Sequence, residues 1–321
     1  MAEQTVDPEL IEQLKKLQAK YDAMGQDLSS YLDGLLHSDY LTYWDYIHLD
    51  TLLSLQTPKT RFPDEKVFIM YHQITELYFR MILHELEQIA ERENIDEQFF
   101  IARIDRIIRY FENLENSFDI MADGMEKDQF LKFRMALLPA SGFQSAQYRL
   151  IEIGSTDLIN LVTINSRDTL KDSNIQTVLD NIYWKSGATE LASGKKTLTL
   201  QQFEEKYMEE FYETGVKFKH RNLRQIYLTH FSNSPNKDKI IASLRQYDLV
   251  ANVHWRLVHL KSSGHYLTRN PDNLPATGGT NWQKYLPPRF QKIMFFPELW
   301  NAEETAEWGK AAIIKLLSNE Q

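Results

Sequence analysis

Cysteine is absent from this sequence, and its absence removes several kinds of chemistry. Disulfide bonds, thiolate zinc sites, iron–sulfur clusters and cysteine nucleophiles are all excluded. The chain also lacks an HExxH zinc motif, a glycine-rich phosphate loop and a GxSxG nucleophile motif. A chain without cysteine suits the reducing cytoplasm, where we expect it to reside.

Positive charge and long apolar runs are also scarce. Lys and Arg number 36 against 45 Asp and Glu, so the net charge is −9 and no basic footprint for nucleic acid is expected. No run of about 18 uncharged apolar residues is present, which argues against a transmembrane helix. The first residues, MAEQTVDPELIEQLKK, lack the apolar core of a signal peptide. We therefore expect neither nucleic acid nor a membrane as a partner.

Glycine and proline, at 12 and 10 of 321 residues, are too few to break the chain often. Few breakers and apolar residues at helical spacing predict an all-α fold, which we interpret as one domain over 1–321. Asp7-Pro8 is a helix start, and Gly25 ends the first pattern. Leu198-Thr199-Leu200 is either a short strand or the start of a helix. Further helices are predicted at about 42–56, 64–92, 96–122, 126–137, 143–163, 198–231, 236–268 and 302–318.

The breakers that do occur are concentrated in one place. Three of the twelve glycines and five of the ten prolines fall between Gly264 and Pro297. This predicts one long irregular loop, and such loops in compact domains are usually functional or disordered.

The predicted helix at 64–92 carries polar side chains within an apolar pattern. His72, Glu76, Arg80 and His84 follow one another at i, i+4 spacing, and Phe68 lies one turn before His72. One interpretation is a seam of paired charges between packed helices, because buried polar groups are normally paired. The other is that His72 points into a pocket beside Phe68.

A second candidate site lies around residues 130–142. Phe130 and Arg134 are one helical turn apart, and Ser141-Gly142 opens the next helix after Pro139. An Arg beside an aromatic ring suits recognition of an aromatic acid, and free N–H groups at a helix start suit a carboxylate. The alternative is an ordinary corner between helices with a surface Arg.

The third candidate is a histidine on an apolar helix. His254 and His259 are five residues apart and so point in different directions, which prevents them from chelating one ion together. A single such histidine is most often a core residue. It is also the way in which a haem iron is held on its proximal side.

Five stretches, in order along the chain, resemble the tryptophan 2,3-dioxygenase family over roughly residues 40–290. They are L-T-Y-W-D-Y-I-H-L-D at 41–50, F-I-M-Y-H-Q-I-T-E-L-Y-F at 68–79, L-P-A-S-G-F-Q-S-A-Q-Y-R at 138–149, W-R-L-V-H at 255–259 and A-T-G-G-T at 276–280.

The resemblance implies a helical haem domain that cleaves the indole C2–C3 bond of L-tryptophan with O₂ to give N-formylkynurenine, opening the kynurenine pathway. It implies non-covalent haem b, ferrous when active, with His259 as the axial iron ligand. It also implies a homotetramer in which the segment 1–40 contacts a neighbouring subunit. His72 corresponds to the distal, catalytic histidine that binds the indole N–H, and we expect it to orient the indole rather than deprotonate it.

The remaining positions implied by the resemblance surround the substrate and the haem. They are Phe68, Phe130, Arg134 and Thr277 at the substrate, Tyr43, Tyr46 and Ile47 from the neighbouring subunit, and Ser141 and Gly142 on the distal side of the haem.

The loop after the proximal histidine departs from the family pattern. His265 stands where the family has Arg, and Ala276 and Trp282 stand where it has Gly. These changes fall on the loop expected to cover the substrate amine. Alternative interpretations are therefore a haem oxygenase that acts on a modified tryptophan or inserts one oxygen, and a haem sensor or helical interaction protein without turnover. The joint presence of Phe68 and Arg134 with their partners argues against the last, because a sensor needs no amino-acid clamp.

Overall fold

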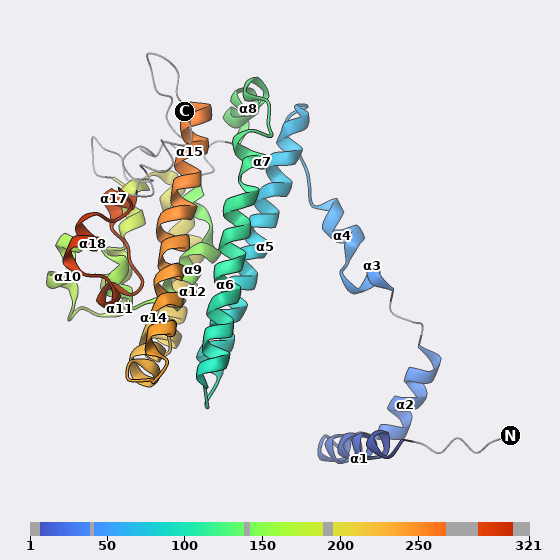
Figure 1. The fold of residues 1–321 in the computed structure, drawn as a ribbon. Coiled ribbons are helices and arrows are strands. Elements are labelled where there is room, and N and C mark those ends of the chain that lie inside the picture. The colour runs from blue at the N-terminus through green and yellow to red at the C-terminus, as the bar shows by residue number, and fades with distance from the viewer. Residues whose placement is uncertain (1–6, 39–41, 138–141, 189–194, 268–287, 311–321) are drawn as a thin grey trace. The chain divides into compact units, whose positions relative to one another are not determined.

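The computed structural model describes residues 7–38, 42–137, 142–188, 195–267 and 288–310 (Figure 1). These residues form helices and contain no strand; one isolated bridge pairs Val162 with Ile182. The predicted all-α fold is thus confirmed. None of the described helices is both long and apolar enough to cross a membrane. The chain divides into two compact units, 1–56 and 57–321, and each is described by itself.

The first unit consists of two longer and two short helices. They are α1 (Pro8–Ala23), α2 (Leu28–His37), α3 (Tyr43–Tyr46) and α4 (Leu49–Ser54). The predicted start of α1 is confirmed, because the Asp7 carboxylate accepts a hydrogen bond from Glu9 N at 2.9 Å. The rings of Tyr21 on α1 and Tyr31 on α2 lie 5.0 Å apart, so these two helices contact each other.

The second unit is built on long helices. Its first half contains α5 (Pro63–Glu91), α6 (Glu97–Ser117), α7 (Asp119–Ala122), α8 (Lys127–Phe133), the 3₁₀ turns η1 (Arg134–Leu137) and η2 (Gly142–Gln144), α9 (Ala146–Ser155), η3 (Leu158–Leu161), α10 (Ile164–Leu170), α11 (Ile175–Asp180) and η4 (Tyr183–Ala188). Its second half contains α12 (Leu198–Phe218), α13 (Leu223–Ile226), η5 (Tyr227–Phe231), α14 (Lys237–Leu249), η6 (Val250–His254), α15 (Trp255–Leu267), α17 (Pro288–Gln291), η7 (Pro297–Leu299) and α18 (Ala302–Ala306).

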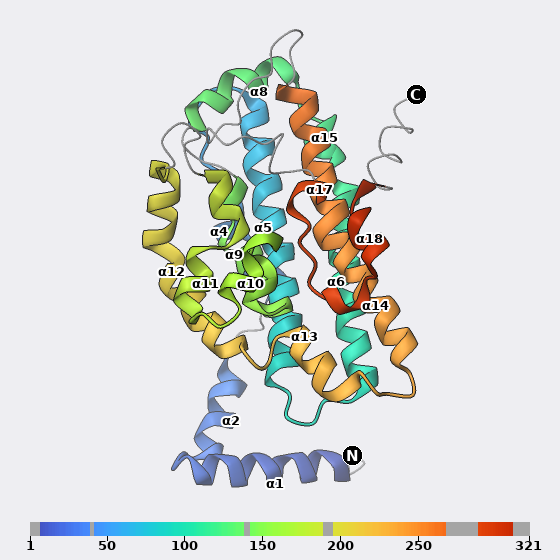
Figure 2. The same cartoon turned by 90° about the vertical axis from the view of Figure 1, so that its left-hand side faces the viewer.

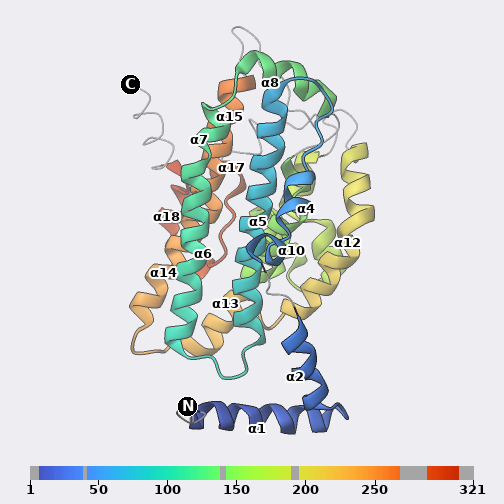
Figure 3. The same ribbon diagram turned by 90° about the vertical axis from the view of Figure 1, so that its right-hand side faces the viewer.

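Helix α5 is the central element of this unit, as its apolar pattern predicted. It packs against α6 on one side and α9 on another, while α12 packs on α9 and α14 packs on α6. Figures 2 and 3 show α5 and α6 running side by side along the bundle. Fully buried rings fill the space between these helices, among them Phe100, Phe111, Phe211 and Tyr247.

Most predicted helices occur where expected, but their ends differ. The helix predicted over 198–231 stops at Phe218, and Asn222 starts a new one by accepting a hydrogen bond from Gln225 N at 2.9 Å. Leu198 begins helix α12 and is not a strand residue. Four short α-helices of the described residues were not predicted: α2, α10, α11 and α17. Of the long irregular loop, residues 268–287 lie outside the described part, as do residues 311–318 of the last predicted helix.

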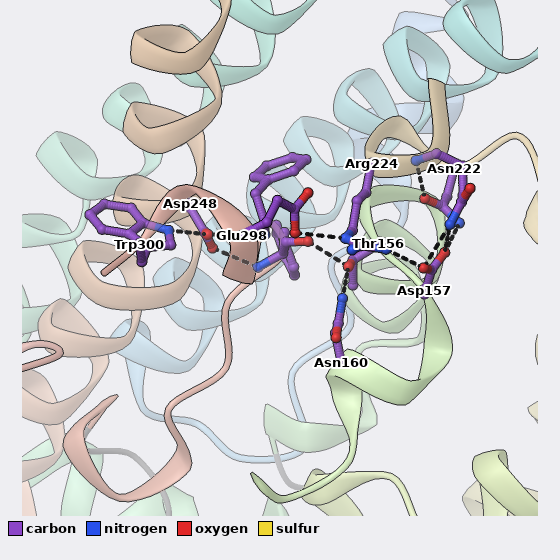
Figure 4. A network of polar contacts seen from close by, with 11 residues as sticks. Thr156, Asp157, Asn160, Asn222, Arg224, Asp248, Glu298 and Trp300 are labelled. Carbon is purple, nitrogen blue, oxygen red and sulfur yellow. Dashed lines mark hydrogen bonds and ion pairs between the residues drawn. The ribbon is translucent and has the colours of Figure 1, made fainter. Parts of the chain in front are cut away.

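A buried carboxylate holds the chain after the loop against α14. Asp248 has no exposed surface and accepts hydrogen bonds from Phe295 N at 2.8 Å, Asn252 Nδ2 at 2.8 Å and Trp300 Nε1 at 2.9 Å. Figure 4 shows the contact between Asp248 and Trp300. Burial raises the pKa of this carboxyl to about 6, while the donors around it oppose the rise. One side chain thereby positions residues 295–300, which return from the loop.

This arrangement predicts a pH dependence of stability. In the unfolded chain an Asp titrates near 3.9, so between about pH 4 and pH 6 the folded protein keeps a proton that the unfolded chain releases. Asp248 therefore makes the free energy of unfolding fall as the pH rises through this window, by up to about 1.4 kcal/mol per pH unit. Asp248→Asn cannot titrate. The measurement is the free energy of unfolding from urea titrations, and we expect the value for wild type minus the value for Asp248→Asn to decrease from pH 4 to pH 6. Parallel pH profiles of the two proteins would contradict the prediction.

Candidate functional site

Aromatic side chains from α5 and α8 meet beside a histidine. The Phe68 ring lies 4.1 Å from the His72 ring, one turn along α5. It also lies 6.2 Å from Phe130 and 5.7 Å from Phe133, both on α8. The two candidate sites predicted separately at 64–92 and 130–142 are therefore one cluster.

The hydrogen bond of His72 determines which of its nitrogens is available. Nδ1 lies 2.8 Å from the carbonyl oxygen of Phe68, which can only accept, so Nδ1 carries the proton and Nε2 is an acceptor. Burial lowers the pKa of His72, although the side chain retains exposed surface. At neutral pH this imidazole is therefore uncharged, and it remains accessible.

Two other polar residues of the α5 pattern, Glu76 and Arg80, have partners outside the row. Glu76 accepts hydrogen bonds from Gln147 Nε2 of α9, at 2.8 Å to its carbonyl and 2.9 Å to its carboxylate. Arg80 pairs with Glu87 at 3.3 Å. The row of four is therefore not one ladder of paired charges, which favours the pocket interpretation for His72.

Arg134 immediately follows α8. Its backbone N–H bonds to the carbonyl oxygen of Phe130, which continues the helical path for one turn into η1. Only 5% of the residue is exposed, and burial lowers the pKa of its guanidinium. A surface Arg at an ordinary corner is thus the wrong interpretation; this charge is inside the protein, next to the aromatic cluster.

His259 lies on α15 among aromatic rings. Its Nδ1 is 3.0 Å from the carbonyl oxygen of Trp255, and its ring centre is 4.6 Å from that of Phe118. Burial lowers the pKa of His259 to about 4, and His72 contributes in the same direction. His259 is therefore neutral at pH 7, with Nε2 as its available lone pair. His254 is engaged elsewhere, 3.5 Å from Glu115.

The donor set at His259 fits a haem better than a chelated ion. Within the described ranges no group of three His, Asp or Glu side chains could hold a metal ion. A haem iron needs only one protein nitrogen on its proximal side. A neutral imidazole whose Nδ1–H is already donated, beside the flat rings of Phe118 and Trp255, supplies that nitrogen.

The remaining predicted positions are not joined to this cluster by any described contact. Ser141 and Thr277 lie outside the described residues, and Gly142 opens η2. Tyr43, Tyr46 and Ile47 belong to the first unit, where Tyr43 and Tyr46 are 70% and 72% exposed. Their predicted role toward a neighbouring subunit stays a prediction.

The second unit also contains a cavity whose lining includes neither His72 nor His259. It has a volume of about 300 Å³ and is formed by the ends of α9 and α12 and by the start of α11. Asp157 lines it and binds Asn222 at 2.9 Å and Gln225 at 2.8 Å; Figure 4 shows Asp157 beside Asn222 and Arg224. None of the predicted site residues lines this cavity.

Sequence reasoning missed a buried group of charged residues between α9 and α15. Arg149, Glu152 and Arg256 meet the hydroxyl group of Tyr183 there. A signal was present, because charged residues within otherwise apolar helices need partners. The distance between 152 and 256 in the chain hid the pairing.

Fold and site together define an all-helical protein with a buried aromatic cluster flanked by two neutral imidazoles. The sequence model of the tryptophan 2,3-dioxygenase family matches residues 34–180. The tryptophan 2,3-dioxygenase of Anaeromyxobacter sp. (strain K) is 40% identical over 121 residues, 37% of this chain and 45% of that protein. That of Ruegeria sp. (strain TM1040) is 44% identical over 121 residues, 36% and 41% of the two chains.

These two matches span less than half the length of the relatives concerned. A longer match joins this chain to the tryptophan 2,3-dioxygenase of Anaeromyxobacter dehalogenans, at 29% identity over 275 residues, 84% of this chain and 97% of the relative. Over most of its length this chain is therefore similar to tryptophan 2,3-dioxygenases.

Proposed function

We propose that the protein is a haem-dependent dioxygenase that inserts both atoms of O₂ across the C2–C3 bond of L-tryptophan, giving N-formylkynurenine in tryptophan catabolism. The observation that carries this proposal is the cluster of Phe68, His72 and Phe130 beside the buried Arg134. Ring contacts through Tyr71 and Phe118 link this cluster to His259. Tryptophan requires such a set, because it has a flat ring, one ring N–H and one carboxylate. The cytoplasmic location stays part of the proposal.

His72 has the chemistry to hold the indole. Its Nδ1–H is donated to Phe68, so Nε2 accepts the indole N–H. The lowered pKa makes this imidazole a weaker base than an exposed histidine, and the indole N–H is a far weaker acid than imidazolium. Orientation of the ring is therefore its proposed role, and removal of the proton is not.

Arg134 is proposed to pair with the substrate carboxylate. A buried guanidinium gains most from an anion that displaces water, and its planar fork matches a carboxylate. Phe68 and Phe130 offer ring faces to the indole and exclude water from the reacting bond. When bound at His259 Nε2, haem b would supply the binding and activation of O₂.

The proposal is tested by the product. We expect purified, haem-supplied protein, reduced without oxygen and then given tryptophan and ¹⁸O₂, to form N-formylkynurenine with two labelled oxygens. His259→Ala is the control and should abolish haem-dependent turnover. A product that carries one labelled oxygen, or an intact indole ring, would reject the dioxygenase assignment.

Arg134→Ala should lower kcat/KM for tryptophan by roughly 30-fold or more. The reason is that an unpaired carboxylate in a buried site costs about 2–5 kcal/mol. Turnover of tryptamine, which has no carboxylate, should change little. Arg80→Ala removes an arginine that is 60% exposed on α5 and is the matched control. Equal losses for tryptophan and tryptamine would refute the carboxylate role.

Self-association into a tetramer is the second part of the proposal. Helix α5 presents an exposed apolar stripe at helical spacing, made of Met70, Ile74, Leu77 and Met81. The first unit exposes large apolar side chains as well, among them Leu36, Tyr43 and Tyr46. Surfaces of this kind mark interfaces. We propose a second copy of the chain as the partner of the stripe, with the first unit contributing Tyr43, Tyr46 and Ile47 to a neighbouring site.

A charge within the stripe should break the assembly. Leu77→Glu is expected to shift the protein from tetramer to smaller species in light scattering coupled to gel filtration, because a carboxylate would be buried without a partner. Leu198→Glu places the same charge at an exposed leucine of α12 and should leave the mass unchanged. A tetrameric Leu77→Glu variant would show that the stripe is not the interface.

A further inference from the structure

The buried charged group between α9 and α15 carries one more positive than negative charge. Arg149 Nη1 lies 2.8 Å from Glu152 Oε2, and Arg256 Nη2 lies 3.4 Å from Glu152 Oε1. Glu152 is 1% exposed, and both arginines are below 10%. A single carboxylate thus serves two guanidinium groups, in a place where ions are costly to bury.

A tyrosine completes this network. The hydroxyl group of Tyr183 donates to Glu152 Oε1 at 2.6 Å. It also accepts hydrogen bonds from Arg149 Nη1 at 3.0 Å and from Arg256 Nη2 at 2.8 Å. Arg256 Nη2 further donates to Asn252 Oδ1 at 3.1 Å. Arg149 and Glu152 on α9, Tyr183 on η4 and Arg256 on α15 thus connect three elements that are distant in sequence.

The two arginines differ in what they connect. Arg149 and Glu152 are both on α9, so their ion pair stays within one helix. Arg256 is on α15, three residues before His259, and reaches across to α9. Residues three apart on a helix point within about 60° of each other, one turn apart. Arg256 is therefore the member of the network that bears on the direction of the His259 side chain.

We propose that Arg256, through its contacts with Glu152 and Tyr183, is a positioning residue that fixes α15 so that the His259 imidazole holds the haem iron. This inference rests on the proposed function, because it requires haem at His259. Helix α15 packs on α6, α7 and α8. The long side chain of Arg256 supplies its tie to α9.

The network offers a matched pair of variants. Arg256→Met removes the tie between helices and leaves Glu152 paired with Arg149 and Tyr183. Arg149→Met removes the same charge and leaves Glu152 paired with Arg256 and Tyr183, so the tie remains. Both variants keep the carboxylate partnered and change the buried charge equally. Arg256→Lys and Arg149→Lys form a second pair that retains the charge, for use where a methionine variant does not fold.

The rate of haem loss from each haem-loaded protein to excess apomyoglobin is the measurement. We expect Arg256→Met to lose haem about 10- to 100-fold faster than wild type, the range found when supporting groups of a metal ligand are removed. Arg149→Met should stay within about threefold of wild type. The iron–imidazole stretching band of the ferrous proteins should shift in Arg256→Met alone, and Arg256→Lys should restore part of both readouts.

Equal acceleration in both methionine variants would show that buried charge matters rather than the tie, and would overturn the inference. No acceleration in either would overturn it as well. If wild type shows no iron–imidazole band that disappears in His259→Ala, the proposed function itself fails, and the two failures are thereby distinguished.

Discussion

One kind of hydrogen bond decides what both histidines of the site can do. In His72 and in His259, Nδ1 donates to the carbonyl oxygen four residues earlier in the same helix, Phe68 O at 2.8 Å and Trp255 O at 3.0 Å. A carbonyl cannot donate, so the tautomer is set by the backbone and Nε2 is left as the acceptor or ligand. Burial keeps both rings neutral. The roles proposed for these residues, indole recognition by His72 and iron ligation by His259, both require a neutral imidazole with Nε2 free to accept, and the same backbone hydrogen bond provides it in each case.

Buried carboxylates on α5 hold neighbouring segments of the chain against this helix. Glu65, at the start of α5, accepts hydrogen bonds from Lys59 N at 2.6 Å and Thr60 N at 2.7 Å. Glu85, further along α5, pairs with Arg106 at 2.8 Å and with Arg103 of α6 at 3.2 Å. Each is buried, so each would be costly if it were left without partners. These carboxylates specify which segments contact one another. The apolar core specifies this less well, because one apolar side chain can often replace another there.

Much of the fold could be predicted from spacing alone. The apolar periodicity of α5 and α6 and the Asp7-Pro8 start of α1 are local signals. The structure has α1 and α5 within a residue or two of their predicted ends, whereas the helix predicted over 96–122 is divided into α6, which ends at Ser117, and the short α7. The break after Phe218 was missed because it depends on Asn222 bonding back to the helix it leaves, a capping contact with no apolar signal. Short helices such as α10 carry no buried face of their own and therefore no periodic pattern.

The candidate site also has contacts that local spacing predicts and contacts that it does not predict. Phe68 beside His72, and Phe130 beside Arg134, are neighbours within a helix, and spacing is enough to pair them. That the two pairs form one cluster depends on how α5 packs on α8, which no local pattern encodes. The Glu152–Arg256 contact spans 104 residues and could be recognised only as two charges in need of partners.

A π-helical turn between α14 and α15 affects the direction in which His259 points. Residues Val250–His254 form a π-helical turn within an otherwise continuous helix from Lys237 to Leu267. Such a turn accommodates one extra residue and rotates everything that follows by about 100°. Asp248 lies before this turn and His259 after it, so the turn sets the angle between the helix faces on which these two residues lie. If the same residues formed a regular α-helix here, His259 would be turned about 100° away from the face on which it now lies.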